Sequence, residues 1–427
     1  MYIISFLGVF AFPFIAWLLS NNRRQINIRL LIATLVFEFA IGYAVFCSSI
    51  GHEVFHVING ALLALLDAAL EGPKFIFGTL ADTTASSKIG LGYILFFQGL
   101  VNIITISALI SVLYYIGIMN RLLKFFAMIF SWITKVSGAE SLASCANLFF
   151  GTESIFSIRY CLPRLTKSEF CVILCACMAT ISVNILSLYV GFLRDVFPNV
   201  VSHFISASLL SVPAAVLCAK LMVPETEKPE TLGINVDPYY EKDSSLVDAM
   251  LSGSEAGFKT VVGVSTLLIA AVGLLAVGDL VIDIIGRHVN SIFGWEFTWS
   301  IQNFFSYLFY PFVWLMGVPM ADVPEVAELL GTRIVATEVP AYLHLSELIR
   351  DKAIEPRSAV IAAYSLCGFT HIPSAAITVG ALTALVPERR LDITSLIWKS
   401  LIAATLACLI TGAVAGIFYQ GDSLLLD

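Results

Sequence analysis

Long apolar runs dominate this sequence and constrain its fold more than any other feature. A helix that crosses the hydrocarbon core of a bilayer needs about 20 mainly apolar residues. Eight runs meet this requirement, at 2–19, 30–48, 92–117, 168–193, 202–222, 260–285, 358–385 and 396–419. Only 13% of the 427 residues are charged, against about 25% in soluble proteins. We therefore predict an all-α polytopic membrane protein with eight transmembrane helices, and we exclude cytosolic enzymes and nucleic-acid-binding proteins.

Four further apolar stretches are unsuited to crossing the membrane directly. The segments 52–71 and 120–134 have polar residues along one side, which predicts amphipathic helices at the interface. The stretches 139–164 and 300–349 are broken by Gly and Pro and contain acidic residues, which predicts two re-entrant hairpins. Irregular backbone is tolerated at membrane depth only where protein or a water-filled cavity covers it.

These elements divide the chain into four parts. We expect scaffold helices 1–3 and the interfacial helices in 1–135, the first hairpin with helices 4–5 in 136–222, a cytoplasmic loop or amphipathic segment with helix 6 in 223–299, and the second hairpin with helices 7–8 in 300–427. Positive residues mark cytoplasmic loops, so the Arg-rich loop 21–29 is placed in the cytoplasm and both termini outside. Most of the nine cysteines lie in apolar runs and are expected to be buried apolar side chains.

The two halves of the chain share a weak repeat. Each hairpin contains a Thr-Glu pair, Thr152-Glu153 in the first and Thr337-Glu338 in the second, followed by a polar turn and a long helix. Both long helices then run into helix-breaking residues, at 180–184 and 370–374. Paired broken helices in corresponding halves indicate a binding site near the middle of the membrane in secondary transporters, where the halves form an inverted repeat.

Glu153 and Glu338 are the acidic residues least expected from the composition. An ionisable side chain at membrane depth is costly unless it is paired, hydrated or functional. A carboxylate there can accept hydrogen bonds from substrate hydroxyls or carry a proton. The alternative is a buried structural acid that accepts hydrogen bonds from backbone amides.

Three polar residues lie close to the breaks and the first hairpin. His371 and Ser374 flank Pro373, where freed backbone and polar side chains could contact a ligand. Asn147 could offer its amide oxygen to a cation. The alternatives are a satisfied core histidine and a hydrogen bond that joins two helices.

One pattern in the sequence is similar to an enzyme motif. The residues His52, Glu53 and His56 match the spacing of HExxH zinc hydrolases, but no third ligand follows at a suggestive distance. The P-loop pattern of ATP-binding proteins does not occur in the sequence. Coupling to an ion gradient is therefore favoured over ATP-driven transport and over an enzymatic function.

Several stretches, taken in order, resemble the concentrative nucleoside transporter family along almost the whole chain. They are Asn21–Arg29, Ser107–Gly117, Gly138–Asn147 leading into Gly151-Thr152-Glu153, Leu165–Glu169, Ser211–Ala215, Ala219–Glu227, Ala341-Tyr342 after Glu338, and Tyr364–Phe369. The resemblance implies a homotrimeric secondary transporter in the bacterial inner membrane. Its family fold has eight spans, interfacial helices and two hairpins, and its members import nucleosides with sodium or protons.

The resemblance also implies the residues of two sites. Nine positions fall on the substrate site: Gly151, Thr152, Glu153, Ile185, Thr337, Glu338, Phe369, His371 and Ser374. Glu338 matches the acid that binds the ribose, and Glu153 matches the first-hairpin acid near the base and sugar. Four positions fall on the family's sodium site, partly through backbone carbonyls: Asn147, Phe150, Thr180 and Ile181. Beyond Na⁺ as coupling ion, no cofactor is implied.

The sequence departs from the family at several of these positions. The usual Gly-Gln-Thr-Glu of the first hairpin is Gly151-Thr152-Glu153, without the Gln that helps to read the base, and the usual Asn of the second hairpin is Thr337. The usual Asn beside the second break is His371. We predict a sodium- or proton-coupled importer of nucleosides or nucleoside-like compounds that works by an elevator-type movement. The alternative is a family relative that imports a different small polar metabolite.

Overall fold

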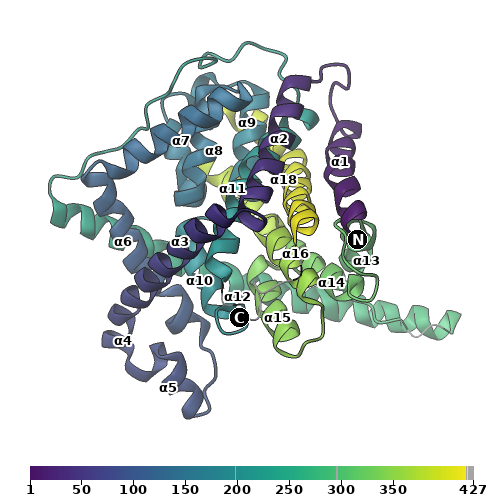
Figure 1. The fold of residues 1–427 in the computed structure, drawn as a ribbon. Coiled ribbons are helices and arrows are strands. Elements are labelled where there is room, and N and C mark those ends of the chain that lie inside the picture. The colour runs from purple at the N-terminus through teal and green to yellow at the C-terminus, as the bar shows by residue number, and fades with distance from the viewer. Residues whose placement is uncertain (198, 295–296, 420, 422–427) are drawn as a thin grey trace.

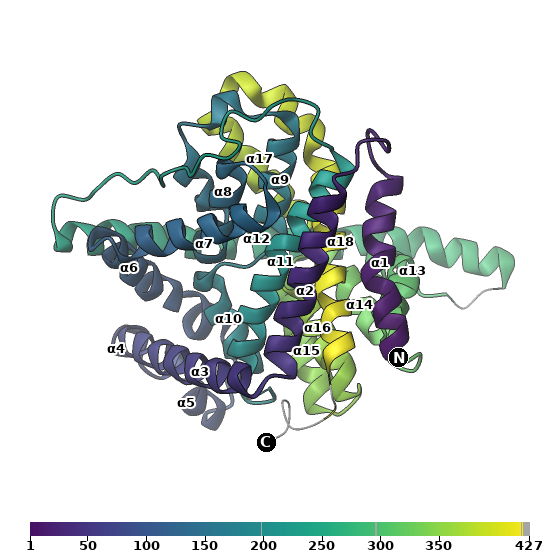
Figure 2. The same cartoon turned by 45° about the horizontal axis from the view of Figure 1, so that its top comes forward.

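The computed structural model describes residues 1–197, 199–294, 297–419 and 421. Within these ranges the regular elements are helical and no β-strand is present, apart from an isolated bridge between Ser137 and Leu232. The all-α fold predicted from the sequence is therefore confirmed. Figures 1 and 2 show steep helices, among them α1, α2 and α18, with α3 running to the left from the lower end of α2.

The N-terminal part contains the helices α1 (Tyr2–Leu18), α2 (Ile28–Phe46), α3 (Ser49–Ala69), α4 (Glu71–Phe77), α5 (Thr83–Lys88), α6 (Asn102–Tyr115) and α7 (Ile118–Thr134), with a π-helical turn at Phe96–Leu100. Two of these fall on the predicted interfacial segments, α3 on 52–71 and α7 on 120–134. Helix α7 is strongly amphipathic: Leu123 is fully buried, whereas Trp132 is exposed. Its position against the helix bundle is shown in Figure 1.

The first repeat contains α8 (Gly138–Phe150), a 3₁₀ segment (Gly151–Ile158), α9 (Lys167–Ala179), α10 (Val183–Leu193) and α11 (Val200–Met222). The second contains α14 (Val323–Val335), α15 (Glu338–Arg350), α16 (Pro356–Leu366), α17 (Ile372–Leu385) and α18 (Arg390–Phe418). The breaks predicted in two long helices are confirmed, because α9 and α10 are separate helices and so are α16 and α17.

Seven described stretches are long and apolar enough to cross a membrane. Six coincide with predicted spans, and the seventh, Glu53–Ser86, overlaps the segment predicted to lie at the interface. The predicted spans 2–19 and 358–385 are represented by shorter helices, α1 and the pair α16 and α17. The total of eight spans and the re-entrant course of the hairpins remain predictions.

Two stretches differ in helical extent from what the sequence suggests. Helix α12 extends from Leu246 to Phe293, well beyond the predicted span 260–285, because Ser245 caps its first turn (Asp248 N to Ser245 Oγ, 3.1 Å) and Gly294 ends it in a left-handed conformation. The stretch 300–349 contains three helices, since α13 (Ile301–Leu315) precedes the α14–α15 pair. Gly317, with φ of +86°, makes the turn that separates α13 from the pair.

Polar side chains tie together the N-terminal ends of the helices in each repeat. Ser137 and Glu140 cap α8, and the Ser137 hydroxyl also donates to Glu169 of α9 at 2.6 Å. The ammonium group of Lys220, near the end of α11, lies 2.6 Å from Glu140. In the second repeat Asp322 precedes α14 and accepts a hydrogen bond from Ser358 of α16 at 2.5 Å. Both repeats thus fasten one end of a hairpin to the start of the following helix.

Helices α6 and α12 pack with their backbones close together. A Cβ on Gly257 would lie 2.7 Å from the Ile104 Cα, and one on Gly253 would lie 2.7 Å from the Ser107 carbonyl oxygen. Small residues spaced by four positions allow this approach between helices in a membrane.

We predict that Gly257→Ala lowers stability by about 1–3 kcal/mol, because the added methyl group overpacks the contact with α6. Gly273→Ala in the same helix is the matched control, since nothing lies within 4 Å of its added Cβ. Thermal unfolding of the detergent-solubilised protein measures both changes. Equal shifts for the two variants would contradict the proposed close packing.

Candidate functional site

A cavity of about 260 Å³ lies where the two repeats meet. All nine residues predicted for the substrate site line it, from four places in the chain: Gly151, Thr152 and Glu153 after α8, Ile185 in α10, Thr337 and Glu338 at the start of α15, and Phe369, His371 and Ser374 around the second break. Helix α12 closes the remaining side. The repeat therefore brings together residues that are more than two hundred positions apart, such as Gly151 and Ser374.

Glu338 is the most constrained acid of the cavity. It is the first residue of α15 and is 3% exposed. The Tyr189 hydroxyl donates a hydrogen bond to its Oε1 at 2.5 Å. Nε2 of His371 lies 2.9 Å from Oε2, and within the described part of the chain Oε2 has no hydrogen-bond partner apart from this contact. A buried carboxylate oxygen without a partner is a strong acceptor for a ligand hydroxyl.

His371 is held in one tautomer by the helix that it caps. It is the residue before α17, and its Nδ1 accepts a hydrogen bond from the backbone N–H of Ser374 at 3.1 Å. A nitrogen that accepts this bond carries no proton, so the proton lies on Nε2 and the ring is neutral. The contact between His371 and Glu338 thus joins a neutral imidazole to a carboxylate, and protonating Nδ1 would cost the cap of α17.

Ser374 is fixed by its backbone neighbours. Its hydroxyl lies within hydrogen-bonding distance of the carbonyl oxygens of Phe369 and His371, the latter at 2.7 Å. Ser374 and Phe369 therefore join the two sides of the unwound segment and place it beside the cavity. The break predicted from Pro373 is capped rather than frayed, which defines the position of the imidazole.

Glu153 lies in a less restrained environment than Glu338. It follows Gly151, whose φ of +61° is accessible mainly to glycine and turns the chain at the end of α8. Within the described residues its side chain makes no hydrogen bond or ion pair and is exposed to the cavity. It also lines a neighbouring cavity of about 580 Å³, which shares Phe150 and Asn184 with the first and continues to Tyr239 and Tyr240 in the polar connection.

The predicted ion-binding residues meet at the ends of α8 and α9. The Asn147 side chain contacts the Thr180 hydroxyl and the Ala176 carbonyl oxygen, the latter at 2.8 Å, and the Ser154 hydroxyl lies 3.3 Å from its Oδ1. Ile181 is buried in the adjoining break, while Phe150 lines the substrate cavity. Side-chain oxygens and the free carbonyls at two helix ends are the donors that a small hard cation requires.

Sequence reasoning missed several residues of these sites. Tyr189 hydrogen-bonds Glu338, Ser154 contacts Asn147, and Thr260, Gly263, Val264, Leu267 and Leu268 of α12 form the far wall of the cavity. A tyrosine inside an apolar run was an available signal, because a buried phenol needs a hydrogen-bond partner. Nothing in the sequence of α12 distinguishes its cavity-facing side.

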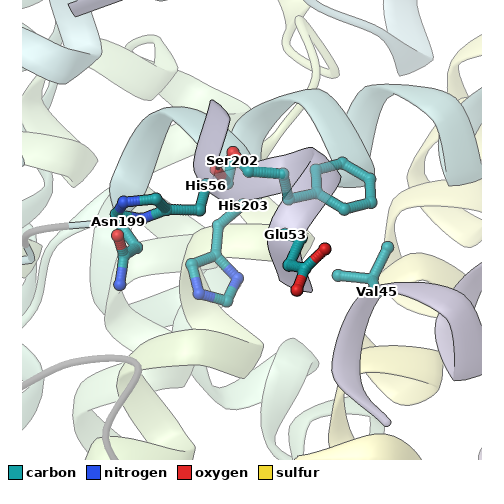
Figure 3. Close-up of a pocket in the computed structure, with 7 residues that line it drawn as sticks. Val45, Glu53, His56, Asn199, Ser202 and His203 are labelled. Atoms are coloured by element: carbon teal, nitrogen blue, oxygen red, sulfur yellow. Dashed lines mark hydrogen bonds between the residues drawn. The ribbon is translucent and has the colours of Figure 1, made fainter. Parts of the chain in front are cut away.

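A second cavity of about 330 Å³ is lined by Glu53, His56 and His203, which Figure 3 shows together. The His203 ring is bound to the Tyr364 hydroxyl at 3.0 Å. The side chain of His52, the first residue of the zinc-hydrolase pattern, lies outside the described residues. Within the described part of the chain no three His, Cys, Asp or Glu residues are grouped so as to hold a metal ion.

Comparison with known proteins shows the family to which the chain belongs. Residues 7–80 and 203–416 match the family described as the Na⁺-dependent nucleoside transporter, N-terminus and C-terminus, and residues 96–195 match a nucleoside recognition family. The chain belongs to the concentrative nucleoside transporter family. Members of this sodium-dependent family are transporters rather than enzymes, so the zinc-hydrolase alternative is set aside.

Relatives of the family match along nearly the whole chain. An uncharacterized transporter of Haemophilus influenzae is 32% identical, over 97% of both chains. Solute carrier family 28 member 3 of Homo sapiens is 31% identical, over 97% of this chain and 60% of the human protein. Among solved structures, CNTnw in an inward-facing substrate-bound state has a TM-score of 0.89 with 29% identity, over 99% of this chain and 100% of CNTnw.

We predict that Tyr189→Phe weakens substrate binding by about 10- to 100-fold, because a hydrogen bond to a charged group contributes about 1.5–3 kcal/mol. Tyr342→Phe is the matched control: its ring packs 4.5 Å from that of Tyr189, but its hydroxyl donates to the Ala363 carbonyl instead. Substrate affinity of the purified variants measures the difference. A comparable loss in both would show that the Tyr189 hydroxyl acts through packing alone.

Proposed function

We propose that the protein is a secondary active importer of nucleosides or close analogues, driven by a sodium gradient. The observation that carries the proposal is the buried carboxylate of Glu338, whose Oε2 has no hydrogen bond and is contacted at 2.9 Å by His371, in a cavity lined by residues of both repeats. Vicinal ribose hydroxyls are donors suited to such an oxygen. The relatives named as nucleoside transporters support this class of substrate.

The remaining cavity residues are assigned to the rest of the nucleoside. Glu153 and Thr152 belong to the first hairpin, whereas Glu338 belongs to the second. We propose that Glu153 and Thr152 face the base. Ile185 and Leu188 of α10, with Val264 of α12, offer apolar surface for a planar ring. Phe369, His371, Ser374 and Thr337 are proposed to surround the sugar beside Glu338. A substrate whose polar groups do not match these side chains would leave buried polar groups without hydrogen-bond partners, and this cost is proposed to make the site selective among substrates.

The coupling ion is proposed to be Na⁺, held by Asn147 and Thr180 with carbonyl oxygens near Phe150 and Ile181. The two helix ends that meet there present carbonyl groups and the negative ends of their dipoles. Sodium bound at this place would fix the first hairpin against the broken helix, and would thereby organise the adjacent substrate cavity. This is how ion binding and nucleoside binding are proposed to be coupled.

Transport is proposed to proceed by an elevator-type movement of 136–222 together with 300–427 against 1–135 and 223–299. The cavity-facing side chains of α12 are apolar except that of Thr260, which donates its hydroxyl to Ala256 of its own helix. The hydrogen bond from the Ile301 amide to Asp279 of α12, at 2.7 Å, lies outside the cavity. An apolar wall without directional bonds allows sliding. The cavity that extends from Glu153 to Tyr239 is the proposed route toward the cytoplasm.

The outer surface of α12 supports a homotrimer embedded in lipid. Ile269, Leu274 and Val277 are 77%, 72% and 59% exposed in the isolated chain. Apolar side chains of this size require cover from lipid or from another subunit. We propose the bacterial inner membrane as the location, with both termini outside.

We predict that Glu338→Gln reduces nucleoside affinity by about 10- to 100-fold, since the variant loses a charged acceptor worth about 1.5–3 kcal/mol. Glu347→Gln on the exposed side of the same helix is the control. Binding or uptake is measured across a panel of labelled nucleosides and modified nucleosides. The site assignment fails if no nucleoside binds, or if Glu338→Gln leaves transport of the actual substrate unchanged.

We predict that replacing sodium by choline abolishes most uptake at two pH values, and that Thr180→Val removes the stimulation by sodium. Thr411→Val is the control, because Thr411 is also buried and bonded within its own helix. Sodium dependence of uptake into proteoliposomes is the measurement. Uptake that follows pH and ignores sodium would instead assign coupling to protons, for which His371 is the candidate.

A second candidate is the import of a different small polar metabolite. The observation that favours it is His371, whose neutral ring replaces the amide usual in the family and lies 2.9 Å from the proposed ribose acid. An amide offers both a donor and an acceptor at its tip, whereas this imidazole presents a single N–H to the cavity. A panel in which modified or non-nucleoside compounds bind more tightly than common nucleosides would select this candidate.

A further inference from the structure

Arg333, near the end of α14, is a fully buried cation that the proposed mechanism does not use. Its side chain is 0% exposed. One terminal nitrogen donates a hydrogen bond to the Ser365 carbonyl oxygen, while Nε and the other terminal nitrogen have no hydrogen-bond partner within the described part of the chain. A buried charge with unused donors is costly in a membrane protein and calls for a specific cause.

The guanidinium lies among helix C-termini, which explains how its charge is tolerated. Ser365 is next to the last residue of α16, and α14 itself ends two residues after Arg333. The last four carbonyl groups of a helix lack partners within the helix and carry a partial negative charge. Arg333 thus compensates two converging helix ends, and the charge of Glu338 in the same hairpin adds a longer-range attraction.

The two breaks adjoin each other beside this charge. A Cβ on Gly368 would lie 2.8 Å from the Ala179 carbonyl oxygen, so the two unwound segments are in contact. The Cys408 thiol lies between them, 3.6 Å from the carbonyl oxygen of Ala179 and 3.8 Å from that of Cys367, and it also interacts with Arg333. Arg333 therefore belongs to the same crossing of broken helices as the candidate sodium site.

The two repeats have the same arrangement at this crossing, with different occupants. In the first, α8 and α9 end together, and Asn147, near the end of α8, bonds to the carbonyl oxygen of Ala176 near the end of α9. In the second, α14 and α16 end together, and Arg333, near the end of α14, bonds to the carbonyl oxygen of Ser365 near the end of α16. A neutral amide leaves the first pair of helix ends without a positive charge, whereas a guanidinium supplies one to the second.

We propose that Arg333 is a tethered cation that fills, in the second repeat, the place that the coupling sodium occupies in the first. This inference rests on the proposed function, in which sodium binds at Asn147 and Thr180. A tethered charge cannot be released on the other side of the membrane, so it contributes nothing to the driving force. The protein therefore couples each nucleoside to a single sodium ion, and its second hairpin stays fastened to α16 whether sodium is present or absent.

The test is the ratio of sodium to nucleoside, determined from reversal potentials of uptake in proteoliposomes. We expect one sodium per nucleoside for the unchanged protein and for Arg333→Lys, which keeps a cation. Arg333→Gln is expected to raise the ratio to two, and to raise the Hill coefficient for thermal stabilisation by sodium from about 1 toward about 2. Arg357→Gln is the matched control, because Arg357 is a second buried guanidinium, bonded to the carbonyl oxygens of Gly317 and Gly416 away from the crossing.

Three results would overturn the inference: two sodium ions per nucleoside in the unchanged protein, an unchanged sodium ratio in folded Arg333→Gln, or the same rise in Arg357→Gln. If Arg333→Gln does not fold, the ratio in the unchanged protein and in Arg333→Lys decides, and any value other than one overturns it. A protein whose nucleoside uptake ignores sodium altogether would contradict the proposed function instead, so the two failures are distinguishable.

Discussion

The fold depends on how backbone groups are satisfied where two helices are interrupted in a protein that is surrounded by lipid. Each interruption frees N–H and C=O groups that lipid cannot bind, so partners must come from the protein or from a ligand. At the second break His371 and Ser374 satisfy amides and carbonyls of the unwound segment. At the first break Asn147 and Thr180 contact the carbonyl oxygen of Ala176. The candidate sites are therefore formed by the side chains that hydrogen-bond to the backbone groups freed at the two interruptions.

Charge follows the same geometry. Helix C-termini converge in both repeats, and each pair of ends attracts a cation, one permanently attached and one proposed to be exchangeable. The anion Glu338 is instead the first residue of α15, where the positive end of the helix dipole favours it. Lys220 and Glu140, far from the cavity, hold the start of α8 in place. Charges with a proposed function thus lie near the turns of the hairpins, whereas Glu140 and Lys220 stabilise the start of the first hairpin.

The sequence predicted the fold class, the helix breaks and the acidic residues of the cavity because each has a local signature. Apolar length indicates a membrane helix, Pro373 indicates an interruption, and an acid such as Glu338 is conspicuous in an apolar context. The resemblance to a family added positions such as Ile185 and Phe369, which have no signature of their own.

Other features of the site could not be predicted from the sequence, mainly because they depend on contacts between distant segments. The tautomer of His371 follows from its hydrogen bond to the Ser374 amide, and the free oxygen of Glu338 follows from the position of Tyr189 in another helix. The full length of α12 was missed because its first turns are polar enough to be taken for a loop. The role of Arg333 could not be predicted, because a single arginine near a hairpin has no sequence signature that distinguishes a fully buried side chain from an exposed one.

The position of Glu153 between two cavities affects kinetics as well as affinity. On the proposed route, a nucleoside that leaves toward Tyr239 passes Glu153, the side chain that is also proposed to hold it. The same carboxylate therefore contributes to residence time at the binding site and to the barrier for departure. Sequence changes at the first hairpin, including the missing Gln, can then trade tight binding against fast turnover, so affinity alone would not rank substrates by the rate at which they are imported.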